Sequence, residues 1–136
     1  MFIELEELNT HMYAENIETI TRGDETILLA AIDTACQEAK GYLSRFDTVA
    51  IFSATGADRN QLLLTFVKDM ATFHLLSLGN PGIDFKLRQD RYDRAVQWLK
   101  AVQKGDVKPD LPDATADPIP AALISYGSNP QRDNNF

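Results

Sequence analysis

Apolar residues recur three and four positions apart through most of the chain, with charged residues between them, which is typical of amphipathic helices. The first long stripe predicts a helix over about 24–44, beginning at Asp24 because an aspartate side chain can cap the first free amide groups. Before it, two short helical turns are expected, joined around Tyr13.

Two further stripes follow. Apolar residues cover much of the circumference of 58–78, which predicts a central helix that can begin at Asp58. A third helix is predicted from Phe85 to Gly105, where glycine provides the left-handed stop. Gly79 to Gly82 reads as a turn between these helices. The pattern therefore predicts an all-α fold, a small bundle of about four helices with an extended C-terminal tail.

The segment 47–59 lacks helical periodicity and mixes β-branched residues with Ser, Thr and Gly. We expect a loop there, with a brief extended piece at 48–52. The core is expected to form where the three long stripes meet. Its predicted members are Ile32, Leu63, Phe66, Met70, Tyr92, Ala95 and Leu99.

Five of the six prolines follow Gly105, which disfavours a further long helix. The sequence thus predicts a helical domain over 1–105 and an extended proline-rich tail over 106–136. One apolar stretch interrupts this polar tail and is a candidate contact for a partner, through Ile119, Leu123, Ile124 and Tyr126.

The chain has 136 residues, 20 acidic and 13 basic, with a formal net charge of −7. Repulsion between like charges disfavours nucleic acid or an anionic membrane as the main partner. No apolar run is long enough to span a membrane, and the first residues are acidic, unlike a secretory signal. We expect a protein that is intracellular when made.

Candidate chemistry is sparse. His11 and His74 have no metal-ligand spacing, and His74 follows an aromatic residue on the apolar central stretch, which favours a packed or hydrogen-bonded histidine over a catalytic base. Cys36 lies among apolar residues and is expected to pack there. The clustered carboxylates are expected on the solvated face: Glu4, Glu6, Glu7, Asp90 and Asp93. We expect no enzyme activity, no metal and no cofactor.

Arg88, Arg91 and Arg94 are spaced three apart and form a basic stripe on the last predicted helix. Two interpretations remain open for them. They can pair with nearby carboxylates or a neighbouring helix, or they can contact an acidic partner surface.

The run RYDRAVQWLKAVQKGDV, residues 91–107, resembles the Mu-like phage and prophage small neck proteins, a family of head-tail connector or head-completion proteins. Three other segments agree with this family in order: the N-terminal paired turns, the helix that reaches Gly-Tyr-Leu, and the central helix. The resemblance spans about residues 2–107. The segment SRFDTVAIFSATGADRN departs from the family pattern, so no family role is assigned to it.

The resemblance implies a virion structural protein of the neck, made in the host bacterial cytoplasm. It further implies a homo-oligomeric ring, plausibly twelvefold, between the portal protein and tail-side proteins, with DNA contacted only in passage. A second hypothesis is a small cytosolic helical regulator or protein-interaction module. Portal, capsid and tail genes beside this one would favour the connector, because a fold alone does not define a function.

Overall fold

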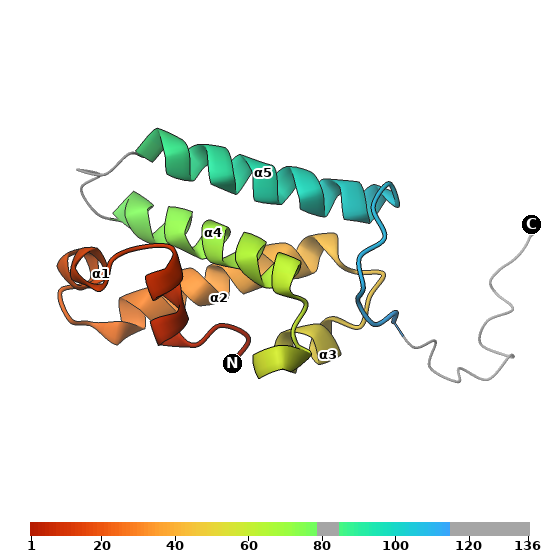
Figure 1. Ribbon diagram of the computed structural model, residues 1–136, viewed down its shortest axis with the longest axis horizontal. Helices are drawn as coiled ribbons and strands as arrows, with labels where there is room; N and C mark the ends of the chain where they lie inside the picture. Colours follow the sequence, from red (N-terminus) through yellow and green to blue (C-terminus); the bar gives the residue numbers. More distant parts are fainter. Residues whose placement is uncertain (79–84, 115–136) are drawn as a thin grey trace, which may run out of the picture.

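The computed structural model describes residues 1–78 and 85–114, and it is all-helical, as predicted. Three long helices form the bundle: α2 (Glu25–Tyr42), α4 (Gln61–Leu78) and α5 (Phe85–Lys104). Figure 1 shows them side by side, and α4 packs against both α2 and α5. The prediction that the central helix lies in the 58–78 stretch is therefore confirmed, since α4 occupies that position.

Shorter elements complete the described fold. They are the 3-10 helix η1 (Leu5–Thr10), α1 (Ala14–Thr21), α3 (Thr48–Ser53) and the 3-10 helix η2 (Gly56–Asp58). Tyr13 is the N-cap of α1, so the two predicted N-terminal turns meet where expected. Asp24 caps α2, accepting a hydrogen bond from the amide of Thr26 at 3.0 Å, and Gly105 ends α5 at φ +89°.

The prediction of a loop over 47–59 with an extended piece at 48–52 is wrong. Residues Thr48–Ser53 form α3, capped by Asp47, whose side chain accepts a hydrogen bond from the amide of Ala50 at 3.0 Å. Ile51 is buried, and Phe52 packs against the core from the same helix. These tertiary contacts outweigh the low helix propensity of a short run containing Thr, Val and Ile.

The central helix also begins three residues later than Asp58. Asp58 belongs to η2, and the side chain of Asn60 accepts a hydrogen bond from the amide of Leu63 at 2.9 Å. Asn60 therefore provides the cap at which α4 starts.

The predicted core is present where α2, α4 and α5 meet. Five of the predicted residues are buried: Ile32, Leu63, Met70, Ala95 and Leu99. Phe66 and Tyr92 are half-buried and pack against that core. Their rings contribute to the α4–α5 interface, since Phe66 lies 5.2 Å from Trp98 and Phe73 stacks on Tyr92 at 4.5 Å between ring centroids.

The first residues after α5 run back along the body of the protein. The amide of Asp47 donates to the carbonyl of Pro112 at 2.9 Å, and the amide of Ala114 donates to the carbonyl of Arg45 at 3.2 Å. Val107 and Leu111 pack against the core. The chain is thus attached as far as Ala114. The rest of the predicted tail and the predicted turn at 79–82 lie outside the described residues.

Candidate functional site

The predicted arginine stripe lies beside an open pocket of about 380 Å³ between the N-terminal segment and α5. This basic pocket is lined by Asn9, Thr10, His11, Met12, Tyr13, Asn16, Arg88 and Arg91. The end of η1, the turn that follows it and the start of α1 supply the first six of these residues, and α5 supplies the two arginines.

Arg88 fixes α5 to that turn. Its Nη2 donates a hydrogen bond to the backbone carbonyl of His11. Its Nη1 is buried and has no hydrogen-bond partner among the described residues. Burial lowers the pKa of Arg88, and the nearby charge of Arg91 lowers it further. The Arg88 guanidinium is therefore partly buried, and its role is to hold α5 against the turn that contains His11.

A buried carboxylate on α4 faces the same cluster. The Asp69 side chain is 10% exposed, and its Oδ1 lies 3.1 Å from His11 Nε2 and 4.0 Å from Arg91 Nη1. That oxygen accepts no well-aligned hydrogen bond within the described part of the chain. One carboxylate thus faces two arginines, and the pocket retains an excess of positive charge.

The pairing interpretation of the stripe is confirmed in part, because Arg91 lies 4.0 Å from Asp69 on the neighbouring helix α4, and contact with an acidic partner stays a prediction. Arg88 serves the fold through its bond to His11, whereas Arg91, 42% exposed at its side chain, reaches the pocket and solvent. Arg94 is exposed and does not line the pocket. Ile119, Leu123, Ile124 and Tyr126 lie outside the described residues, so their predicted partner contact stays a prediction.

Sequence reasoning missed the parts of the pocket that come from the N-terminal turn. His11 and Asp69 are 58 positions apart in the sequence, and they meet because η1 packs beside α4. An aspartate on the apolar central stretch was the available signal, because a buried charge requires a partner. Tyr13, 77% exposed, adds an aromatic rim to the pocket.

The other histidine is hydrogen-bonded, as predicted. His74 Nε2 on α4 lies 2.9 Å from Glu38 Oε1 on α2, and its ring lies edge-on to Tyr92 at 5.6 Å between centroids. No group of three or more His, Cys, Asp or Glu residues that could hold a metal occurs in residues 1–78 and 85–114.

One of the predicted surface carboxylates has a different role. Glu7 forms a bidentate ion pair with Arg59, with Nη1–Oε1 and Nη2–Oε2 distances of 2.7 Å each. Arg59 also donates to the carbonyl of Phe2 at 2.8 Å. The pair therefore attaches η1 to the segment before α4. The expectation that Glu7 lies on a purely solvated face is wrong, because Glu7 is paired with Arg59. The local sequence pattern could not predict this pair, since the two residues are 52 positions apart.

The basic pocket suits recognition of an anionic group. Arginine guanidinium groups bind carboxylates with directional, charge-assisted hydrogen bonds. The hydroxyl of Tyr13 and the amide groups of Asn9 and Asn16 add neutral hydrogen-bonding groups around Arg91. The pocket thus offers several hydrogen-bond donors that can bind an anionic group.

The described residues thus form a small all-α bundle with a basic pocket on one face. The family is shown by the sequence: the model of the family described as Bacteriophage Mu, Gp36 matches residues 2–124, and the chain belongs to this family. It is therefore a phage protein, and the predicted resemblance to Mu-like phage proteins is confirmed.

No curated protein and no solved structure matches the chain. No helix within the described ranges is long and apolar enough to cross a membrane.

Proposed function

We propose that this protein is a head-tail connector or head-completion subunit, which assembles as a ring between the portal and the tail of a phage or prophage particle. Membership in the Bacteriophage Mu, Gp36 family supports a phage role. The basic pocket carries the proposal further, because it offers a specific protein-binding site on a chain whose net charge is −7.

The charge distribution suits a subunit through which DNA passes. Acidic residues that face a channel repel the phosphate backbone and so avoid retaining DNA in transit. A local cluster of arginines can still bind an acidic protein surface by short-range contacts. Salt screens the longer-range repulsion that the negative net charge of the chain exerts on such a surface. The protein would thus hold its protein partners and let DNA move.

The proposed ring uses heterologous contacts, in which one face of each subunit binds a different face of the next and the rotation between neighbours closes. A rigid bundle built on α2, α4 and α5 is suited to this repetition, and we propose a homo-oligomeric ring, plausibly twelvefold. The proposed partners are the portal protein and tail-side proteins, at the virion neck after assembly in the host cytoplasm. We propose no catalytic role.

Arg91 is the side chain we assign to the acidic partner. It lines the pocket and is partly exposed, whereas Arg88 is occupied by the carbonyl of His11. Arg94, one turn further along α5 and exposed, extends the same basic surface. The apolar tail residues Ile119, Leu123, Ile124 and Tyr126 provide a second proposed contact.

The test uses a lysogen that lacks this gene and carries it on a plasmid. Arg91→Glu should reduce the yield of infectious particles at least tenfold and leave heads without tails in electron micrographs. Lys100→Glu is the matched control, because it makes the same charge change at an exposed position of α5 outside the pocket. Circular dichroism melting would verify that both variants fold.

Normal, tailed particles from the lysogen lacking the gene would refute the connector role. If expression of phage genes changed instead, the regulator hypothesis would replace it. A folded Arg91→Glu protein that restores the full yield would leave the connector role intact but remove the pocket from it.

A further inference from the structure

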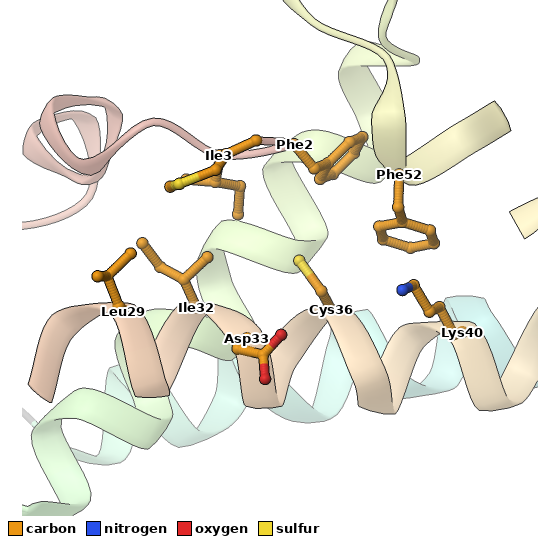
Figure 2. Close-up of a pocket in the computed structure, with 9 residues that line it drawn as sticks. Phe2, Ile3, Leu29, Ile32, Asp33, Cys36, Lys40 and Phe52 are labelled. Carbon is orange, nitrogen blue, oxygen red and sulfur yellow. The ribbon is translucent and has the colours of Figure 1, made fainter. Parts of the chain in front are cut away.

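A second hollow lies between α2, the N-terminal residues and α3. This apolar groove has a volume of about 260 Å³ and is lined by Met1, Phe2, Ile3, Leu29, Ile32, Asp33, Cys36, Lys40 and Phe52. Figure 2 shows Ile32 and Cys36 on α2 facing Ile3 and Phe2, with Leu29 and Lys40 at opposite ends.

The two ends of the groove differ in chemistry. At one end, Lys40 Nζ lies 5.5 Å from the centroid of the Phe52 ring, a cation–π contact that joins α2 to α3. At the other end, Leu29 is 39% exposed (Figure 2). The groove is therefore narrowed by a charged contact at the Lys40 end and open at the Leu29 end.

The chain itself contains a segment that suits this groove. Residues 118–130 carry no charged side chain and include the apolar residues Ile119, Leu123 and Ile124. Their branched side chains match a groove whose floor is made by Ile32 and Cys36. Pro118 and Pro120 restrict the backbone at the start of this segment. Binding it in an extended conformation therefore costs less conformational entropy than binding a segment without prolines.

We propose that the apolar groove binds the tail segment 118–130 of a second copy of this chain, so that each subunit inserts its tail into its neighbour. This inference rests on the proposed function, because it requires subunits that assemble. It names the surface on which the apolar tail residues would dock.

The attachment of the chain at Ala114 favours a neighbouring copy over the same molecule. The amide of Ala114 donates a hydrogen bond to the carbonyl of Arg45. Arg45 follows the C-terminal end of α2, so this attachment is nearest to the Lys40 end of the groove. The open end at Leu29 lies about 20 Å from Tyr42 along the helix, at about 1.5 Å per residue. Five residues separate Ala114 from Ile119 and span at most about 17 Å.

To place its Ile119 in its own groove, a chain's tail would thus have to enter from the Lys40 end, past the Lys40–Phe52 contact. The tail of an adjacent subunit can enter at the open Leu29 end. Head-to-tail contacts of this type repeat from subunit to subunit, and they form a ring when the rotation between neighbours closes.

The single cysteine of the chain provides a direct test, because it lines the groove. Two full-length chains are mixed: the natural chain, with Cys36, and a Cys36→Ala, Leu123→Cys chain. Diamide is then added as the oxidant that accepts the two electrons and two protons released by disulfide formation. A disulfide between position 36 of one chain and position 123 of the other gives a covalent heterodimer, which mass spectrometry identifies.

The matched control is a Cys36→Ala, Asn134→Cys chain, with its thiol on the tail outside the apolar segment. We expect at least fivefold more heterodimer with the thiol at position 123 than at position 134. A chain with Leu123→Cys and the natural Cys36 should accordingly form disulfides between chains in denaturing gels.

Two results would overturn the proposal. One is an intramolecular disulfide in the chain with both thiols, which would show that the tail occupies its own groove. The other is heterodimer no more abundant than in the control. Light scattering on the natural chain separates the two proposals: oligomers without the 36–123 disulfide would refute the groove contact and leave ring assembly standing.

Discussion

The hydroxyl of Tyr92 on α5 donates a hydrogen bond to Glu38 on α2. The second oxygen of the same carboxylate lies 2.9 Å from His74 Nε2 on α4. One glutamate therefore connects all three long helices of the bundle. Burial raises the pKa of Tyr92, and its hydrogen bond to Glu38 raises it further, so the phenol is a donor at neutral pH.

Tyr92→Phe should lower the free energy of unfolding by about 1 to 2 kcal/mol, because it removes a hydrogen bond to a carboxylate while retaining the ring that stacks on Phe73. Urea denaturation measures the change. Tyr42→Phe is the matched control, since the hydroxyl of Tyr42 makes no hydrogen bond within residues 1–78 and 85–114, and it should change stability by less than about 0.5 kcal/mol. Equal effects of the two substitutions would contradict the role assigned to Glu38.

Leu99→Ala should destabilise the protein by about 2 to 5 kcal/mol, because Leu99 is fully buried in the core and its truncation leaves a cavity. The same truncation at Leu62, which is 51% exposed on α4, should cost less than about 0.5 kcal/mol. Denaturant midpoints with unchanged slopes report both values. A Leu99→Ala midpoint equal to that of the natural chain would place Leu99 outside the core.

The sequence was sufficient to predict the long helices, because each carries an apolar stripe with a recognisable start or stop, such as Asp24 or Gly105. It failed at α3, where six residues are too few to show a helical period and Ile51 is held by packing against distant residues. Two of the eight residues that line the basic pocket, Arg88 and Arg91, belong to the predicted arginine stripe. The other six come from the N-terminal segment, and their place beside α5, like the approach of His11 to Asp69, depends on tertiary packing, which no local pattern encodes.

The Glu7–Arg59 ion pair should make stability depend on acid pH. The pKa of Glu7 is lowered from its ordinary value of 4.5 to about 2, chiefly by its hydrogen bonds with Arg59. A lowered folded-state pKa means that the stabilisation is present above about pH 4.5 and is lost as the pH falls towards 2. Because Glu7 remains 27% exposed at its side chain, we expect a contribution of about 1 to 2 kcal/mol.

Glu7→Gln should accordingly be less stable than the natural chain at pH 6, and the difference should shrink towards zero near pH 2. Urea denaturation at several pH values measures this convergence. Glu6→Gln is the control, because Glu6 is exposed and forms no ion pair within the described part of the chain. A Glu7→Gln difference that stays constant from pH 6 to pH 2 would show that the ion pair does not couple folding to protonation.

Cys36 should react slowly with alkylating reagents in the folded protein. Burial raises the pKa of its thiol to about 11, and the nearby Lys40 offsets this only in part. The thiolate is the reactive form, so at pH 8 about one thiol in a thousand is reactive, compared with roughly one in four for an unperturbed cysteine of pKa 8.5. Iodoacetamide alkylation followed by mass spectrometry should therefore proceed at least a hundredfold more slowly in the folded chain than in urea. The alkylation rate should rise about tenfold per pH unit between pH 8 and 10. A rate that levels off near pH 9 would contradict the raised pKa and show that the thiol is exposed. The groove would then be more open than its lining by Phe2, Ile32 and Phe52 indicates.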